Sequence, residues 1–274
     1  MKYLIASDIH GSAFWCHKLL ERFVAEQADG LWLLGDVLYH GPRNDLPEEY
    51  SPKKVIAMLN PLSSQIVCVR GNCDAEVDQM VLDFPIMDET RQILWPAAGP
   101  RPGESQFAAG TGPQPGESQF AAGTGPRPGE SQLAAGAGFS PDKTGLQPTG
   151  AAKAAEPQES RTRILLTHGH HINKDTLSLP ETKERYGALD CDVLIYGHFH
   201  VPLKTRVGHV WCLNPGSVSI PKENSPHSYM VFEDGGFFWK DMEGNVYDSL
   251  PGKKIYDTLA AAQSVRYNSY IRQS

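Results

Sequence analysis

Aspartate, asparagine and histidine recur along this chain in short motifs that also contain glycine. The nitrogen and oxygen donors of these side chains are those that divalent transition metals bind in proteins. Glycine beside the polar residues permits tight turns and close approach of the backbone, as a site assembled from several segments requires. The motifs are Asp8-Ile9-His10, Gly35-Asp36, Gly71-Asn72-Cys73-Asp74, His168-Gly169-His170 and Gly197-His198-Phe199-His200.

Each motif comes at the end of a short apolar run that is typical of a buried strand. In open α/β sheets, ligands bind outside the carboxyl ends of the strands. The motifs are therefore expected to meet at one edge of a sheet, and Asp8 and His10 are expected on the same side if the chain remains extended there. The predicted strands are 2–7, 31–34, 65–69, 163–167 and 193–196.

Single motifs also have explanations that need no metal. Asp8 could cap the following helix, and Asn72 could form a turn. The histidines from His168 to His171 could lie in a solvated loop. These explanations do not account for five such strand endings in order, so we predict one metal-binding cluster.

The elements between the motifs indicate an α/β unit at the start of the chain. Residues 14–25 have an amphipathic helical pattern, and residues 52–59 form a second helical stretch between predicted strands. Crossover segments of this kind favour parallel pairing in the first sheet. Further on, a strand is expected at 210–213, followed by a hairpin in which 229–232 pairs with 237–239. The sequence thus predicts a layered α/β or α+β sandwich.

Residues 99–160 differ in composition from the rest of the chain. These 62 residues hold 9 of the 21 prolines and 12 of the 26 glycines, and contain three copies of the 13-residue repeat G-P-x-P-G-E-S-Q-[FL]-A-A-G-[TA]. One large apolar residue per copy buries too little surface to offset the entropy of ordering. We expect a disordered low-complexity insert, or alternatively a partner-binding segment that presents Phe107, Phe120 and Leu133.

The insert interrupts a single domain made of residues 1–98 and 161–252, and a tail with a helical pattern follows at 253–274. The insert rejoins the domain at the N-terminal end of the predicted strand that leads to His168. That end lies opposite the motifs. Deletion of residues 99–160 is therefore expected to leave metal-dependent activity nearly intact.

Charge and cysteine content restrict the classes of function. The chain has 274 residues with 25 basic and 32 acidic side chains, a formal net charge of -7. Such a surface has no general attraction for nucleic acid or for an anionic membrane. Five cysteines without a C-x-x-C pair, and no signal peptide or long apolar run, indicate a reduced, cytoplasmic protein without a membrane span.

The ordered motifs D-x-H, GD, GN-x-D, H-G-H and G-H-x-H resemble those of the calcineurin-like metallophosphoesterase superfamily. The resemblance covers residues 1–98 and about 161–240, and the stretches 34–44, 69–80 and 213–222 are similar to small bacterial phosphodiesterases of that superfamily. It implies a four-layer α/β/β/α sandwich with two divalent metal ions. Manganese is the expected metal, with iron, zinc, nickel, cobalt and magnesium as alternatives.

The resemblance also implies how seven residues share the two ions, with Asp36 as the bridge between them. Two ions held about 3.5 to 4 Å apart can stabilise both oxygens of an in-line phosphoryl displacement. The other implied ligands are Asp8, His10 and His200 for one ion and Asn72, His168 and His198 for the other.

The expected function is hydrolysis of a small phosphodiester by a hydroxide that bridges the metals. The alternatives are a phosphomonoesterase or a nuclease of the same superfamily, or a catalytically silent binding module. None of the seven ligands is missing, which disfavours the silent module. No basic, aromatic-interleaved groove supports a nuclease. The sequence leaves a homo-oligomer open.

Cys73 departs from the family pattern, because many members have histidine after the asparagine. A thiol is a weaker proton donor to a leaving alkoxide than an imidazolium, so we expect a preference for activated aryl diesters. Asp74 could orient the Cys73 loop or a histidine. The turn at 214–217 is interpreted as part of the rim of the cleft. Further residues that could contact phosphate or the leaving group are His170, His40 and Arg43.

Overall fold

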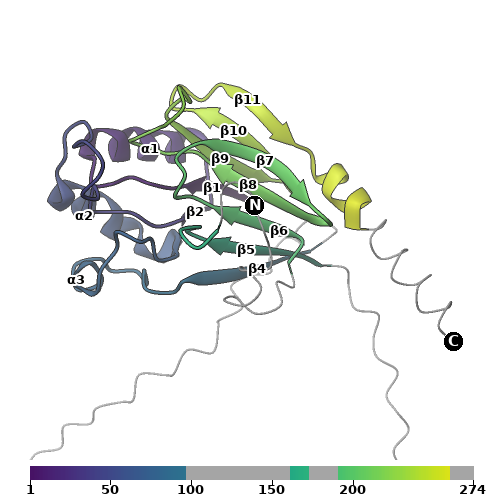
Figure 1. The fold of residues 1–274 in the computed structure, drawn as a ribbon, viewed down its shortest axis with the longest axis horizontal. Coiled ribbons are helices and arrows are strands. Elements are labelled where there is room, and N and C mark those ends of the chain that lie inside the picture. The colour runs from purple at the N-terminus through teal and green to yellow at the C-terminus, as the bar shows by residue number, and fades with distance from the viewer. Residues whose placement is uncertain (97–160, 173–190, 260–274) are drawn as a thin grey trace, which may run out of the picture. The chain divides into compact units, whose positions relative to one another are not determined.

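The strands form two mixed β-sheets (Figure 1), and three of the predicted motifs follow strands of the first sheet. In this computed structural model, the described residues are 1–96, 161–172 and 191–259. Across the first sheet, the strands are β11 (Val246–Leu250), β10 (Gly236–Asp241), β9 (Ser228–Glu233), β1 (Lys2–Ala6), β2 (Gly30–Leu33) and β3 (Ile66–Cys68).

Parallel and antiparallel halves meet at β1 in the first sheet. Strands β1, β2 and β3 are parallel to one another, as the sequence predicts. Strand β9 pairs antiparallel with β1, and β10 continues the sheet as the predicted hairpin partner of β9. The parallel strands β1, β2 and β3 therefore all end at the same edge.

The second sheet contributes the remaining two motifs. Strands β5 and β6 are parallel, so Thr167 and Tyr196 lie side by side at their carboxyl ends. Strand β4 pairs antiparallel with β5 along its whole length, with Pro96 opposite Arg161. Across this sheet, the strands are β4 (Thr90–Pro96), β5 (Arg161–Thr167), β6 (Val193–Tyr196), β8 (Val210–Pro215) and β7 (Pro202–Val207).

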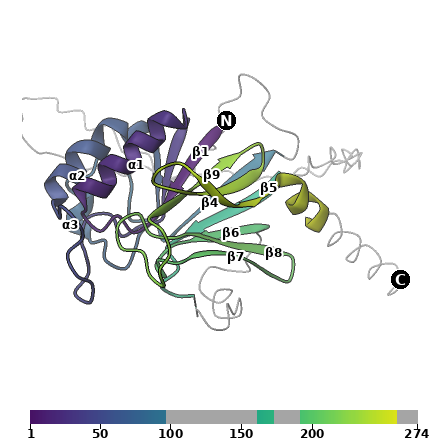
Figure 2. The same ribbon diagram turned by 90° about the horizontal axis from the view of Figure 1, so that it is seen from above.

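Helices cover the outer face of the first sheet (Figure 2). Helix α1 (Ala13–Ala25) begins at Ser12, whose side chain accepts a hydrogen bond from the Trp15 backbone at 3.2 Å and so caps the helix. Helix α2 (Pro52–Leu59) begins with proline, which has no amide hydrogen to leave unsatisfied. The one-turn helix α3 (Glu76–Gln79) and the 3-10 helix η1 (Asn60–Gln65) complete the helical elements that have named bounds.

Alternating side chains of β1 and β2 point to two different cores. Leu4 and Leu31 face the helices, whereas Tyr3 and Trp32 face the second sheet. The rings of Tyr3 and Trp32 stack with their centroids 4.8 Å apart. Trp95 of β4 is 1% exposed and joins this intersheet core, where truncation to alanine typically costs about 3 to 5 kcal/mol.

The mixed α/β sandwich is confirmed, and the described residues show three of its expected four layers. A third cluster that includes Leu194, Tyr196 and Cys212 lies on the outer face of the second sheet. The described residues do not test the prediction of a fourth layer, and the insert at 99–160 and the tail beyond residue 259 lie outside them. Residues 252–259 are helical, and Ile255 packs into the intersheet core. None of the described helices is long and apolar enough to cross a lipid bilayer.

Candidate metal centre

All five motifs meet where the parallel strands of the two sheets end. Glycine at position 197 lets the sheets approach, because a Cβ there would lie 1.8 Å from Ser7 Oγ. The backbone amide of His198, from the second sheet, donates to Asp8 Oδ2 of the first sheet at 3.1 Å. The prediction that these motifs lie together at one edge is confirmed by this geometry.

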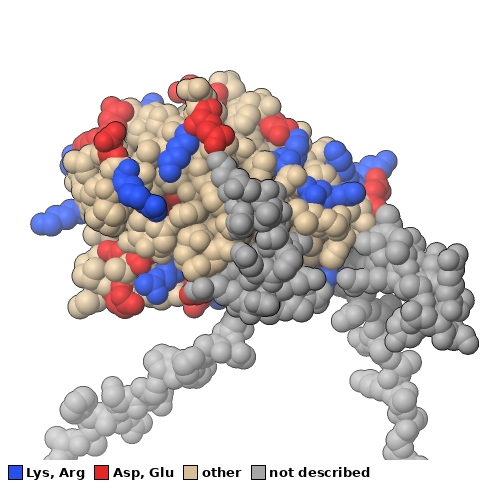
Figure 3. Space-filling model, in the orientation of Figure 1, with Lys and Arg blue, Asp and Glu red and all other residues tan. Residues whose placement is uncertain are grey.

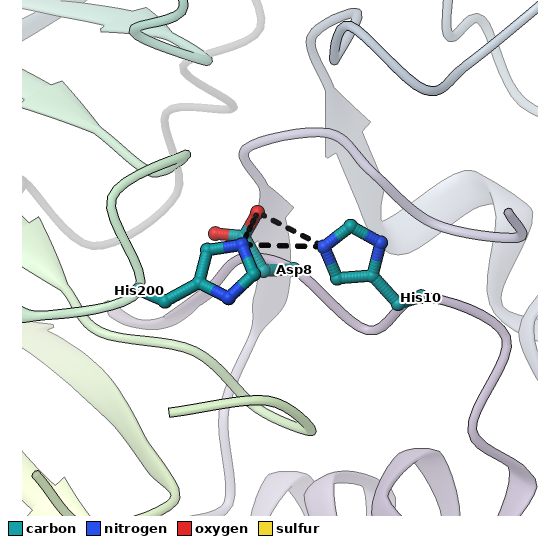
Figure 4. A group of neighbouring side chains, drawn as sticks. All are labelled: Asp8, His10 and His200. Carbon is teal, nitrogen blue, oxygen red and sulfur yellow. Dashed lines mark hydrogen bonds and ion pairs between the residues drawn. The ribbon is translucent and has the colours of Figure 1, made fainter. Parts of the chain in front are cut away.

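Asp8, His10 and His200 form the first group of donors (Figure 4). The Oδ1 atom of Asp8 lies 3.5 Å from Nε2 of His10 and 3.2 Å from Nε2 of His200. The two Nε2 atoms are 3.3 Å apart. All three residues are buried, with His200 the most exposed at 3%.

A second group of donors lies around His168. Its Nε2 atom is 3.3 Å from Asp36 Oδ2, 3.1 Å from Asn72 Oδ1 and 3.3 Å from His198 Nδ1. His168 is fully buried, whereas Asn72 is exposed and His198 is half-buried. The group therefore has a buried base and an open outer side.

Asp36 contacts both groups through one oxygen. Its Oδ2 atom lies 3.7 Å from His10 Nε2 in the first group and 3.3 Å from His168 Nε2 in the second. Its Oδ1 atom accepts a hydrogen bond from the Cys73 backbone amide at 2.8 Å, which fixes the carboxylate plane. This side chain is the point at which the two groups join.

Backbone carbonyls orient three of the four imidazoles. The Nδ1 atom of each ring points at a carbonyl oxygen: His10 at Tyr39 (2.8 Å), His168 at Leu34 (2.6 Å) and His200 at Ile220 (2.6 Å). The Nδ1 atoms donate, because a carbonyl can only accept. In each ring, Nε2 is then directed at the cluster, an arrangement common among metal-binding histidines.

Left-handed backbone conformation is concentrated in these motifs. A non-glycine residue with positive φ carries strain that the surrounding structure must offset, and such strain clusters at functional sites. Five of the seven predicted ligands adopt it: Asp8 (60°), His10 (49°), Asp36 (54°), His198 (67°) and His200 (60°).

Neighbouring opposite charges keep the carboxylates ionised. Burial alone would raise the pKa of Asp8, but His200 and His10 outweigh it and hold that pKa well below its usual range. Burial opposes the same effect at Asp36, whose pKa is lowered chiefly by His168. In return, and against the effect of burial, Asp36 raises the pKa of His168 to about 9. The cluster thus holds two ionised, buried carboxylates, which favour a cation beside them.

The donors present fit divalent metal ions. Asp8 Oδ1 is buried and forms no hydrogen bond. The Nε2 atoms of His10 and His200 face each other at 3.3 Å with both Nδ1 hydrogens already donated, so two lone pairs meet and require a cation between them. That cation is a proton or a metal ion. The adjoining carboxylates supply the mixed nitrogen and oxygen ligands of a transition metal.

The other predicted site residues lie at varied positions around the cluster. Cys73 is half-buried beside His10 and Asp36, whereas Asp74 is buried behind them. The His170 ring lies 5.6 Å from that of His168, measured between centroids. His40 and Arg43 lie in the loop between β2 and α2, where His40 packs edge-on against the rings of Tyr39 and Tyr50. Arg43 is exposed and forms no hydrogen bond or ion pair with any described residue.

Sequence reasoning missed the support that the loop after β8 gives to the cluster. The hydroxyls of Ser217 and Ser219 both donate to the Asp8 carbonyl at 3.0 Å. Both serines are buried. Ser217 ends the predicted turn at 214–217 and Ser219 follows it, and that turn is the one sequence signal that points to this place.

Comparisons with known proteins all find similarity to phosphoesterases. A family model described as the calcineurin-like phosphoesterase superfamily domain matches residues 137–234. The phosphodiesterase YfcE of Escherichia coli K12 is 34% identical over 234 residues, covering 85% of this chain and 88% of YfcE. The solved structure of E. coli YfcE, described as a phosphoesterase, superposes with a TM-score of 0.60 at 31% identity, covering 91% of this chain and 98% of that one. A probable metallophosphoesterase of Mycoplasma genitalium is 33% identical over 82 residues, 27% of this chain and 48% of its own length.

Proposed function

The chain belongs to the calcineurin-like phosphoesterase superfamily and is a hydrolase, and from this premise we propose that it cleaves phosphodiesters with two divalent metal ions, which we take to be manganese. A relative that is 34% identical over most of the chain carries the name phosphodiesterase, which supports a diester substrate. The observation that carries the dimetal proposal is the position of Asp36, whose Oδ2 atom lies 3.7 Å from His10 Nε2 and 3.3 Å from His168 Nε2.

The proposed ligand sets follow the two groups of donors. When bound, the two ions would supply Lewis acidity toward the phosphoryl oxygens and water that ionises near neutral pH. Asp36 would contribute to both sites, because its Oδ2 atom lies near histidines of both groups. The remaining ligands are Asp8, His10 and His200 for the first ion and Asn72, His168 and His198 for the second.

Four residues border the side of the cluster from which a substrate can approach. Asn72 and His198 lie on the open side of the cluster, so a phosphate can approach from there. Cys73 and His170 border the same side. Because a thiol is a weak acid, we propose that diesters with good leaving groups are the preferred substrates.

The surface supports a small substrate in preference to a nucleic acid. On the face shown in Figure 3, lysine and arginine are interspersed with aspartate and glutamate, without one extended basic patch among the described residues. The five cysteines form no disulfide bond with one another, and we propose that the protein works in the reducing cytoplasm.

Metal-dependent diester hydrolysis is the direct test. We expect metal-stripped protein to cleave bis-p-nitrophenyl phosphate only when manganese is added, and to cleave p-nitrophenyl phosphate more slowly. Asp36→Asn and His198→Ala should each lower manganese-dependent turnover by about 100-fold or more, because a direct ligand is lost. His17→Ala, which alters an imidazole that is 67% exposed on α1, should leave turnover unchanged.

Other results would favour the alternatives. Faster turnover of the monoester would indicate a phosphomonoesterase, and turnover of RNA alone would indicate a nuclease. No turnover of any of these compounds by folded, metal-loaded protein would contradict the proposal and favour a binding module.

A further inference from the structure

The thiol of Cys73 lies beside the metal-binding cluster and is distinct from the other cysteines. Cys16, Cys68, Cys191 and Cys212 are buried, whereas Cys73 is half-buried. A thiol sulfur of Cys73, a ring nitrogen of His10 and a carboxylate oxygen of Asp36 all lie within 4.8 Å of one another. This third group of donors shares two residues with the groups described above.

The surrounding residues hold the Cys73 sulfur in place. The Asn72 side-chain amide donates to Sγ at 3.2 Å, and the Cys73 backbone amide donates to Asp36 Oδ1 at 2.8 Å. A Cβ on residue 41 would lie only 3.1 Å from Sγ, so glycine there leaves the sulfur the space it occupies. The sulfur is therefore positioned toward His10 and Asp36 before any metal binds.

The donor types decide which cations this group favours. A sulfur ligand selects thiophilic metals such as zinc, whereas oxygen ligands suit manganese and magnesium. Imidazole and carboxylate complete the kind of mixed site that zinc occupies in proteins. Asp8 Oδ1, which is buried without a hydrogen bond and lies 3.5 Å from His10 Nε2, is available as a fourth donor.

We propose that Cys73, His10 and Asp36 form a separate binding mode for a thiophilic divalent cation such as Zn²⁺ or Cd²⁺. Binding replaces the S–H bond of Cys73 with a sulfur–metal bond and releases one proton to solvent, without oxidation or reduction. Because His10 and Asp36 also belong to the proposed dimetal centre, this mode excludes the manganese arrangement. The exclusion of manganese rests on the proposed function, whereas the binding of a thiophilic cation does not.

Cadmium titration of metal-stripped protein, followed by the sulfur-to-cadmium absorption in the ultraviolet, tests the binding mode directly. We expect wild-type protein to develop this absorption as one cation binds. Cys73→Ser and Cys73→Ala should lack it, and their affinity for cadmium should fall by about tenfold or more. Cys212→Ser, which removes a buried thiol remote from the cluster, is the matched control and should retain the absorption. Circular dichroism establishes that each variant is folded.

Competition with manganese tests whether His10 and Asp36 take part. Excess manganese should move the cadmium titration of wild-type protein to higher cadmium concentrations. Absorption that persists in the Cys73 variants, fails to develop in wild-type protein, or is indifferent to manganese would overturn the proposal. The absorption can be measured without any turnover. Failure of the phosphodiesterase proposal can therefore be distinguished from failure of the cation-binding proposal.

Discussion

At the scale of single residues, one carboxylate outside the ligand set organises the loops that carry Asp36 and Asn72. Asp74 is 3% exposed, and its Oδ2 atom accepts from the backbone amides of Asp36 at 2.8 Å and Gly71 at 2.7 Å. Its Oδ1 atom accepts from the Val37 amide at 2.9 Å. Burial and the charge of Asp36 raise the pKa of Asp74. The three hydrogen bonds tie the ends of β2 and β3 together.

We expect Asp74→Asn to weaken both folding and metal binding. The amide nitrogen that replaces one carboxylate oxygen cannot accept, so at least one buried backbone amide loses its partner. The free energy of unfolding should fall by about 1 to 3 kcal/mol. Manganese affinity should fall by about 10- to 100-fold, as is usual when a residue that orients metal ligands is removed.

Urea denaturation and metal titration check the two effects separately. Asp83→Asn, at an exposed position, is the matched control and should change neither quantity. Unaltered metal affinity in a folded Asp74→Asn protein would show that the loops hold their positions without this carboxylate.

At the scale of elements, the loop after β8 positions the end of β1. Besides the two serine hydroxyls on the Asp8 carbonyl, the Val218 amide donates to the Ser7 carbonyl at 3.0 Å. The Ile220 carbonyl orients His200. The same short loop thus fixes two residues of the first donor group, one from each sheet.

Replacing both serines with alanine should loosen the first donor group. The buried Asp8 carbonyl would lose two of its donors, and the Ser219 amide at 3.3 Å would remain. We expect Ser217→Ala with Ser219→Ala to lower stability by about 1 to 3 kcal/mol and to weaken manganese binding about tenfold. Calorimetric metal titration measures the second effect, with Ser51→Ala as control, since the Ser51 side chain makes no capping hydrogen bond. Equal affinities for the double variant and the wild type would refute this role.

The C-terminal end of α1 is joined to the first sheet through Glu26. Its Oε1 atom accepts from Lys240 at 2.5 Å and from Tyr229 at 3.1 Å, and its side chain is 12% exposed. Burial alone would raise the pKa of Glu26, but Lys240 outweighs it and the net pKa is lowered. The folded protein therefore keeps this carboxylate charged at a lower pH than the unfolded chain does.

The contribution of Glu26 to the free energy of unfolding should fall as the pH is lowered. This contribution is fully present above the ordinary glutamate pKa of about 4.3 and is lost as pH falls through the lower pKa of the folded state. Metal-free Glu26→Gln should be about 1 to 3 kcal/mol less stable than wild type near neutral pH, with the difference shrinking in acid. Denaturant titrations at neutral and acidic pH, with the exposed Glu21→Gln as control, measure this. A difference that does not depend on pH would contradict the assignment.

At the scale of the whole molecule, the ends of β4 and β5 to which residues 97–160 attach lie opposite the ends that bear the metal cluster. The connection, residues 97–160, follows Pro96 of β4 and ends before its paired residue Arg161 of β5, whereas Thr90 and Thr167 pair at the end that bears the cluster. Six residues at about 3.3 Å each place roughly 20 Å between the two ends. In topology, residues 97–160 take the place of a hairpin loop.

Replacing residues 97–160 with Asn-Gly should preserve activity and raise stability. Manganese-dependent turnover should stay within about twofold of the full chain. A shorter loop loses less entropy when its ends are brought together, by about 0.6 kcal/mol for each halving of its length. Shortening the 64-residue connection to 2 residues halves the length five times, so the free energy of unfolding should rise by up to about 3 kcal/mol. Kinetic assay and urea denaturation of both proteins check this. Loss of turnover in a folded deletion variant would assign the insert a functional role.

The apolar pattern of the sequence correctly predicted the helices and strands whose conformation depends on residues that are close together in the chain. The buried strand β6 occurs as predicted at 193–196, and α1 differs from its predicted range by one residue. The edge strands β4 and β7 were not predicted. Their burial varies along the chain without a continuous apolar run, and pairing with a neighbouring strand determines their conformation.

Which side chains meet could be predicted from local pattern, because each motif follows a strand that its own residues specify and parallel strands share one edge. How these side chains are held depends on contacts between distant segments. The Tyr39 and Ile220 carbonyls orient His10 and His200, and Asp74 acts on backbone amides of two loops. Backbone acceptors and donors are the same in every residue type, so their partners emerge only when distant segments pack together.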